Sequence, residues 1–246
     1  MLLIVAALQD ELDAAMALCR GCRKLPGRNG NLWRGERNGK EVYFLRAGFG
    51  PRRSAVSLER SLPLIQPAQI LLIGYAGGLD PGVKLGHLVA VRKALEISPD
   101  GNRPAWTHVR IDGSFELVDG ESLAGFAQSI GLSARVGDVL TTSYVLGDPA
   151  HKVALYERFH ACIVDMETAA LARVADRHST PLSCIRAISD ELEDTFLIPF
   201  SGVPSEKISG RLRKLIHPSL IQSLRTWRSH AAVAKRSLSR FLASYL

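Results

Sequence analysis

Two short runs place a carboxylate where an apolar segment ends. They are Val164–Thr168 (VDMET) and Arg186–Asp190 (RAISD). Between them, Ala169–His178 carries Ala, Leu, Val and Arg at helical spacing, and Pro181–Ile188 is expected to form the next strand. Ligands of open α/β sheets bind at the carboxyl ends of strands, and a carboxylate desolvated there without partners costs several kcal/mol. The two runs therefore indicate a pocket in which carboxyl groups act as acids, bases or ligand contacts.

A third acid lies near the amino terminus. Leu2–Ala7 is an apolar run of strand length, and Leu8–Leu12 (LQDEL) opens a helix, so Glu11 follows the first expected strand directly. Each acid also has a purely structural interpretation. Glu11 and Glu167 are suited to the first turn of a helix, where the macrodipole favours acids, and Asp190 is suited to a helix N-cap.

The elements that must position these acids alternate between strands and helices. This order predicts a single α/β domain with a central, mostly parallel mixed sheet flanked by helices. Loops are expected at the Gly- and Asn-rich Arg23–Gly39, which includes a hairpin, at Gly74–Gly86, and around Asp112-Gly113. The remaining predicted strands are Glu41–Ala47, Gln69–Ile73, Leu88–Arg92 and Arg135–Thr141, and the remaining predicted helices are Pro51–Leu64, Ser122–Ile130 and Pro149–Phe159.

Four motifs in this order resemble the nucleoside phosphorylase and nucleosidase superfamily: Ile4–Leu12 (IVAALQDEL), Gly74–Leu79 (GYAGGL), Val164–Thr168 and Arg186–Asp190. Within it, they look most like methylthioadenosine/S-adenosylhomocysteine nucleosidases. The resemblance extends from Leu2 to about Asp190. Beyond that point the loop and basic tail resemble hopanoid-associated purine nucleosidases, in character rather than by motif. The joint occurrence of three acids in the family's order favours catalysis over three separate helix-end roles.

The resemblance implies hydrolysis of the N-glycosidic bond of an adenosine-type nucleoside substituted at the 5′ position, with release of adenine. Glu11 would remain ionised and activate water, Glu167 would hold the ribose 2′- and 3′-hydroxyls, and Asp190 would be kept protonated to deliver a proton to purine N7. It implies no metal and no bound cofactor. Further substrate contacts would be Met166 against the sugar, Ser189 orienting Asp190, Tyr75, Ala76 and Gly77 at the sugar side, and Tyr144 and Val145 at the base, with Ser143 as an alternative.

Two departures from the family pattern bear on the activity. Tyr75 stands where these nucleosidases usually have serine, and its bulk supports an alternative in which the chain is a nucleoside-binding protein with little turnover. Leu72 stands where phosphorylases of the superfamily commonly have arginine, which favours water over phosphate. The alternative is a phosphorylase whose anion loop is formed by Gly48 and Gly50 with Arg46 nearby.

Composition fits one soluble domain. The chain has 246 residues, of which 46% are hydrophobic and 22% charged, enough for one large core. The first apolar run is too short to span a membrane and has no basic leader, so a cytoplasmic location is expected. Cys162 and Cys184 lie in apolar segments. Cys19 and Cys22 form an isolated C-x-x-C, for which the end of a helix is a better interpretation than a zinc or redox site.

The formal charge of +7 is concentrated at the end of the chain. Nine of the 31 Lys and Arg residues follow residue 206, where no Asp or Glu occurs, so the preceding part carries 22 basic and 24 acidic side chains. A nearly neutral body with a basic tail argues against nucleic-acid binding. We expect residues 1–216 to form the catalytic domain, working as a homodimer by resemblance.

Residues 217–246 are expected to form a basic amphipathic helix. Its apolar residues recur in steps of four and three, which predicts one continuous seam. The seam would pack on the body or on a second subunit; the alternative is peripheral contact with an anionic membrane surface, at the inner membrane face. The seam residues are Leu220, Leu224, Trp227, Ala231, Ala234, Leu238, Phe241 and Tyr245.

Overall fold

The computed structural model describes residues 1–26, 31–100, 106, 108–195 and 218–246, with the backbone alone from 218 to 228. In this part of the chain ten strands form one mixed sheet flanked by helices, as predicted. The strands are β1 (Leu2–Ala6), β2 (Arg20–Lys24), β3 (Leu32–Arg37), β4 (Lys40–Arg46), β5 (Gln69–Gly78), β6 (Leu88–Pro99), β7 (Val109–Glu116), β8 (Ala134–Thr141), β9 (Ile163–Asp165) and β10 (Leu182–Asp190), and the helices are α1 (Gln9–Met16), α2 (Pro51–Ile65), α3 (Gly120–Ser129), α4 (Pro149–Phe159), α5 (Thr168–Arg177) and α7 (Pro218–Tyr245).

Strand pairing closes part of the sheet on itself. β5 pairs with β10, β10 with β6, β6 with β8, β8 with β9, and β9 with β5 again. From β5 the sheet continues through β1 and β4 to the β3–β2 hairpin. The three acids lie at the ends of β1, β9 and β10, and each of these strands pairs with β5. The buried side chains of β1 and β5 are apolar, whereas β9 and β10 also bury Asp165, Arg186 and Asp190.

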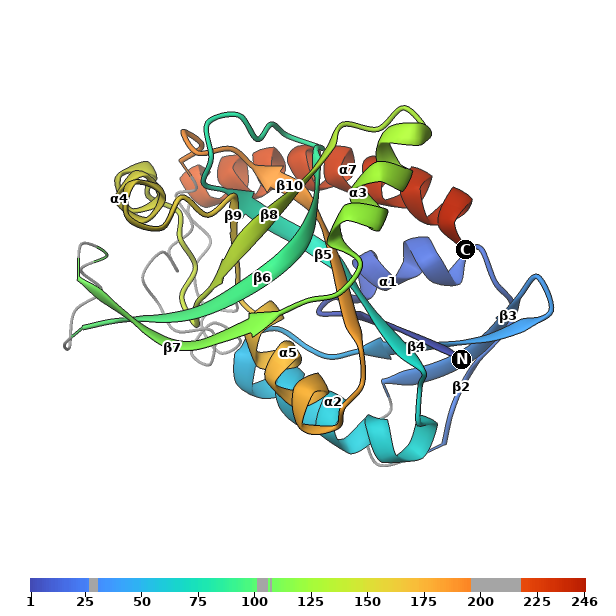
Figure 1. The fold of residues 1–246 in the computed structure, drawn as a ribbon. Coiled ribbons are helices and arrows are strands. Elements are labelled where there is room, and N and C mark those ends of the chain that lie inside the picture. Colours follow the sequence, from blue (N-terminus) through green and yellow to red (C-terminus); the bar gives the residue numbers. More distant parts are fainter. Residues whose placement is uncertain (27–30, 101–105, 107, 196–217) are drawn as a thin grey trace.

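Helices cover the sheet on two sides (Figure 1). α2 and α5 lie together on one side, while α1, α3 and α7 lie on the other, and α4 lies apart from both groups near the edge of the molecule. α4 begins at Asp148, whose side chain accepts a hydrogen bond from the amide of Ala150, with Pro149 in the first helical position. Its observed bounds are those predicted from the sequence.

The C-terminal helix packs its apolar seam on the body. In the part of α7 whose side chains are described, Ala234, Leu238 and Phe241 have no exposed surface. They contribute to the same core as α1, α3 and β10. The second half of the seam therefore packs on the body. Leu220, Leu224 and Trp227 lie outside the residues with described side chains.

Two glycine-containing segments expected to be loops are strands. Gly74–Gly78 continues β5, where it pairs with β10, and Asp112-Gly113 lies within β7, opposite β6. The prediction failed because glycine and aspartate are depleted in strands, whereas here tertiary pairing overrides that preference. The helix-end interpretation of Cys19 and Cys22 is also partly wrong, because Cys22 lies in the short strand β2.

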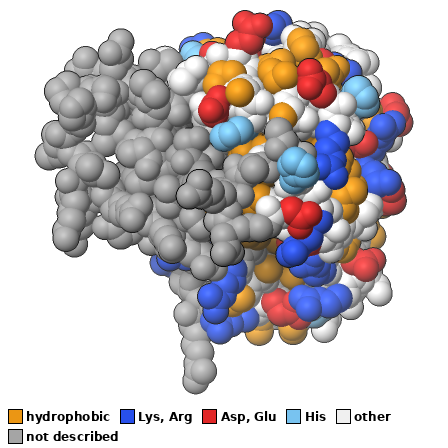
Figure 2. Space-filling model, turned by 90° about the vertical axis from the view of Figure 1, so that its left-hand side faces the viewer, with side chains coloured by type: hydrophobic (Ala, Val, Ile, Leu, Met, Phe, Trp, Pro, Cys, Tyr) orange, Lys and Arg blue, Asp and Glu red, His pale blue; other side chains and the backbone are white. Residues whose placement is uncertain are grey.

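On the surface drawn in Figure 2, basic and acidic side chains lie among one another in the described part. This agrees with the nearly balanced charge of residues 1–206. None of the helices in the described ranges is both long and apolar enough to cross a membrane.

Candidate active site

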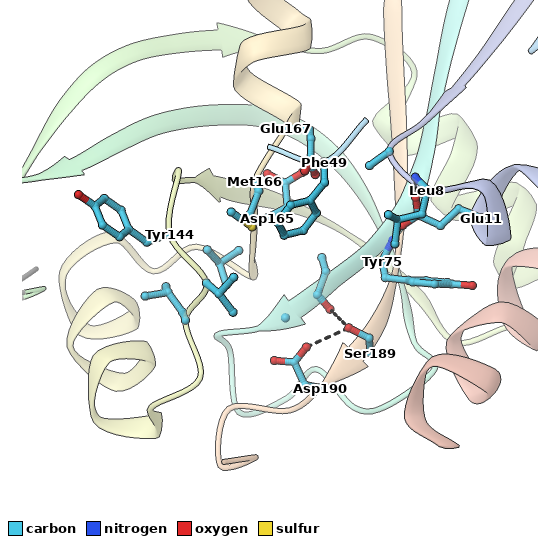
Figure 3. Close-up of a pocket in the computed structure, with 16 residues that line it drawn as sticks. Leu8, Glu11, Phe49, Tyr75, Tyr144, Asp165, Met166, Glu167, Ser189 and Asp190 are labelled. Atoms are coloured by element: carbon cyan, nitrogen blue, oxygen red, sulfur yellow. Dashed lines mark hydrogen bonds between the residues drawn. The ribbon is translucent and has the colours of Figure 1, made fainter. Parts of the chain in front are cut away.

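A cavity of about 170 Å³ opens at the ends of β1, β5, β9 and β10. Glu11, Glu167 and Asp190 all line it, so the structure brings together the three acids predicted from sequence. Figure 3 shows Glu167 with Met166 and Phe49 on one side, Glu11 with Leu8 on a second, and Asp190 with Ser189 on a third. The other lining residues are Ala7, Tyr75, Ala76, Gly77, Tyr144, Val145, Leu146, Val164 and Asp165.

Glu11 is held in the first turn of α1 and is 3% exposed. One carboxylate oxygen accepts the Leu8 amide at 2.8 Å, and the other accepts the Tyr75 amide at 3.0 Å. Burial raises the pKa of Glu11, and the positive charge of Arg186 opposes this increase. The resemblance implies that Glu11 remains ionised as the general base, whereas burial raises its pKa above that of an exposed carboxyl group.

Gly74 is required by the packing of Glu11 against Arg186. A Cβ atom at this position would lie 2.3 Å from Arg186 Nη1 and 2.9 Å from Glu11 Oε1, and the residue has φ +153°. The glycine therefore lets the backbone of β5 pass directly beside an acid and a cation. This close approach explains why a glycine run occurs inside a buried strand.

Asp165, the acid at the end of β9, anchors the floor of the site. Its carboxylate accepts Arg186 Nη2 at 2.5 Å, Thr141 Oγ1 at 2.6 Å, and the hydroxyl of Thr168. Arg186 also donates to the carbonyl of Ile73 at 3.3 Å. This buried ion pair has hydrogen bonds on both members, which is the condition under which such a pair is tolerated. It fixes the ends of β5, β9 and β10 relative to one another.

Glu167 is the residue immediately before α5 and is 6% exposed. Its Oε1 atom accepts the Gly50 amide at 2.8 Å. Burial, together with the neighbouring charge of Asp165, raises the pKa of Glu167 to about 8 against the opposing charge of Arg186. Its side chain makes no cap to its own helix, so the helix-start interpretation explains its position but not its direction into the cavity.

Asp190 ends β10 at an irregularity in strand pairing. The register shifts between Ile188 and Asp190, which re-aims the last side chains of the strand. Ser189 Oγ donates to Asp190 Oδ1 at 2.9 Å, as the sequence interpretation proposed. Lys152 Nζ of α4 donates to Asp190 Oδ2 at 2.5 Å. Gly77 lies beside it, since a Cβ there would meet Oδ2 at 2.7 Å.

Tyr75 does not fill the region between the three acids. Its side chain points from the cavity toward α7 in Figure 3, and its hydroxyl donates to Asp10 Oδ2 at 3.0 Å. Asp10 in turn pairs with Lys235 of α7. At the opposite end of the cavity, Tyr144 packs edge-to-face on Trp106, with ring centroids 5.8 Å apart.

The comparisons with known proteins agree with this architecture. The family model of the phosphorylase superfamily matches residues 2–212. The chain belongs to the phosphorylase superfamily. A methylthioadenosine/S-adenosylhomocysteine nucleosidase of Marinomonas sp. is 27% identical over 199 residues, covering 76% of this chain and 84% of that protein. A nucleosidase of the same name from Geobacillus kaustophilus is 26% identical over 195 residues, covering 76% and 83%.

Two solved structures share the fold. A methylthioadenosine/S-adenosylhomocysteine nucleosidase of Helicobacter pylori superposes with a TM-score of 0.74 at 18% identity, covering 99% of this chain and 96% of that one. The futalosine hydrolase of the same organism superposes with a TM-score of 0.73 at 17% identity, covering 100% and 97%. Both likenesses show a shared fold.

The anion loop proposed for a phosphorylase of this superfamily lies in a neighbouring cavity. Gly48, Gly50 and Arg46 line a cavity of about 580 Å³ that shares only Phe49 with the cavity of the acids. Both glycine amides are already engaged, that of Gly48 by the carbonyl of Ala7 at 3.1 Å and that of Gly50 by Glu167. The arrangement therefore couples the Gly50 amide to Glu167.

Lys152 and Phe49 are site residues that sequence reasoning missed. Phe49 lies between two glycines that were considered only for their backbone amides. Lys152 left a weak signal, since it lies three residues before the fully buried Leu155 and so on the core-facing stripe of α4. Ser143, the alternative contact for the base, is not among the residues that line the cavity, whereas Tyr144 and Val145 are.

Proposed function

We propose that this protein hydrolyses the N-glycosidic bond of an adenosine-type nucleoside substituted at the 5′ position and releases adenine. The observation that carries the proposal is the convergence of Glu11, Glu167 and Asp190 on one cavity in a member of the phosphorylase superfamily. Relatives named as methylthioadenosine/S-adenosylhomocysteine nucleosidases support it.

Each acid has a role that its surroundings support. Glu11 takes the proton from the attacking water, because it lines the cavity and burial makes it a stronger base than an exposed carboxylate. Glu167 accepts hydrogen bonds from the ribose hydroxyls, with one oxygen held by the Gly50 amide. Asp190, oriented by Ser189, transfers a proton to purine N7 as the bond between C1′ and N9 breaks. Met166 supplies an apolar surface for the sugar.

Water rather than phosphate is the nucleophile in this proposal. Leu72, at the position where phosphorylases of the superfamily commonly have arginine, is fully buried in the apolar core. The amides of Gly48 and Gly50 donate within the chain. The phosphorylase alternative has one supporting observation, which is the concentration of Arg46, Arg52 and Arg53 around the adjoining cavity.

Product analysis separates these activities. Purified protein is incubated with methylthioadenosine in phosphate-free buffer and again with added phosphate, and the base and sugar products are identified. The proposal expects adenine with a free sugar at a rate that phosphate does not raise. A sugar 1-phosphate as main product would establish the phosphorylase, and tight nucleoside binding without base release would establish the low-turnover binding protein.

The 5′ substituent is the finer part of the proposal. The apolar lining contributed by Leu8 and Phe49 favours an apolar group, such as a methylthio group or the larger adenosylhopane type. The hopanoid expectation depends on the basic tail and on the loop after Asp190, where Thr195–Phe200 (TFLIPF) is apolar; residues 196–200 of this loop lie outside the described residues. Comparison of kcat/KM for nucleosides with progressively longer apolar 5′ groups tests this point.

Homodimer assembly stays a prediction, for which light scattering of the purified chain is the test.

A further inference from the structure

Lys152 is a cation buried directly behind Asp190. It has no exposed surface, although lysine is almost never fully buried unless it is paired. Its Nζ atom donates to Asp190 Oδ2 at 2.5 Å and to the carbonyl of Glu191 at 2.7 Å. It does not line the cavity, so it reaches substrate only through Asp190.

The other charged groups around this pair have partners of their own. The Glu191 carboxylate accepts Lys84 Nζ at 3.1 Å and the Leu85 amide at 2.9 Å. Asp194 accepts the Glu191 amide and faces His230 of α7. On α4 itself, Asp148 caps the helix. His151 of α4 packs against Trp106. Among the described residues, Asp190 is therefore the carboxylate that forms an ion pair with Lys152.

This pairing raises a question about the proton that reaches the base. Asp190 must carry a proton when N7 accepts one, whereas an ammonium group in contact favours an ionised carboxylate. The contact supplies a second source for this proton. Lys152 Nζ, which carries only donor protons, lies 2.5 Å from the Asp190 oxygen that faces it.

We propose that Lys152 is the proton reservoir of Asp190, a positioning and relay residue for the proposed glycosidic cleavage. As the bond between C1′ and N9 breaks, its electron pair stays with the purine, N7 takes a proton from Asp190, and Asp190 takes a proton from Lys152 Nζ. The water oxygen bonds to C1′ and its proton passes to Glu11. After product release Glu11 loses its proton to solvent and Lys152 regains one, so the cycle has no net proton change.

The inference rests on the proposed function, and its first test is the pH dependence of kcat for adenine release. Lys152→Met keeps the length of the side chain and removes the charge. The variant is expected to lose about 100- to 10,000-fold in kcat at pH 8, the range for a general acid. It should recover most of this loss near pH 5, where solvent protonates the carboxyl group, while KM changes little. Lys84→Met, which removes the neighbouring cation paired with Glu191, should leave the profile unchanged.

Two outcomes would overturn the proposal. A Lys152→Met variant with the wild-type profile would show that the lysine is dispensable, and an equal loss of kcat at every pH would show a structural role. Lys152→Arg adds a sharper comparison, because a guanidinium keeps the charge but does not release a proton. Wild-type kcat in this variant at pH 8 would mean that charge alone suffices.

If the variants fold poorly, the pH dependence of kcat in the wild-type enzyme still tests the proposal. The wild-type kcat should persist to pH 8, and a fall of kcat above about pH 6 would contradict a donor that lysine recharges. If no base is released, the proposed function fails by itself. The carboxyl ¹³C signal of Asp190 then tests the pair, since its titration midpoint should move to higher pH in Lys152→Met; an unchanged midpoint would refute the coupling.

Discussion

Removal of the Glu167 carboxylate should stabilise the protein at alkaline pH. Burial and the adjacent Asp165 raise the pKa of Glu167 from 4.5 to about 8. A group with a raised pKa in the folded state contributes stability below its unfolded pKa and loses it as pH rises through the folded value. The contribution of Glu167 to stability is therefore lost between pH 4.5 and pH 8. At about 1.4 kcal/mol per pKa unit, the upper limit of the loss is on the order of 5 kcal/mol.

Glu167→Gln tests this directly, because the amide oxygen can still accept the hydrogen bond from the Gly50 amide. Urea unfolding at pH 5, 7 and 9 should give similar free energies for the variant and wild type at pH 5. By pH 9 the variant should be more stable by several kcal/mol. Glu116→Gln, whose side chain is 75% exposed, is the control and should show no such trend. A difference in the free energy of unfolding between Glu167→Gln and wild type that does not change with pH would refute the raised pKa of Glu167.

Three further predictions concern the site. Glu11→Gln should reduce base release by about 100- to 10,000-fold while adenine binding stays measurable by calorimetry, because Glu11 acts on water rather than on the base; loss of adenine binding together with a lowered melting temperature would instead indicate a structural role. Gly74→Ala should lower both thermal stability and turnover, because the new Cβ lies 2.3 Å from Arg186 Nη1; an unchanged melting temperature would contradict the tight packing. Tyr75→Phe should retain turnover, since the hydroxyl bonds Asp10 away from the acids; an activity loss of tenfold or more would place that hydroxyl in the chemistry.

The acids were predictable because local patterns fix them. Glu11, Glu167 and Asp190 each lie at a junction between apolar strand residues and a polar turn. The strands before Glu11 and Asp190 both pair in parallel with β5, so their carboxyl ends meet at one edge, whereas β9, before Glu167, pairs antiparallel with β5. The bounds of α4 were also predictable, because Asp148 and Pro149 form a strong local start signal. These features depend on residues close together in sequence.

The remainder depends on contacts between distant residues. Gly74–Gly78 resembles a turn by composition, yet pairing with β10 makes it a strand in which glycine admits Arg186 and Asp190. The direction of Tyr75 toward Asp10 depends on α1 and α7 together. The burial of Lys152 depends on how α4 docks against the end of β10. No local pattern contains this information, because each partner is supplied by another element.

The most direct test of the central claim is the rate of adenine release by wild type and Asp190→Asn. The amide is nearly isosteric with the carboxyl group but cannot give N7 a proton, so the fold and the melting temperature should change little. We expect wild type to release adenine from methylthioadenosine without phosphate and the variant to be about 100- to 10,000-fold slower. Adenine release by the variant at the wild-type rate would contradict the account.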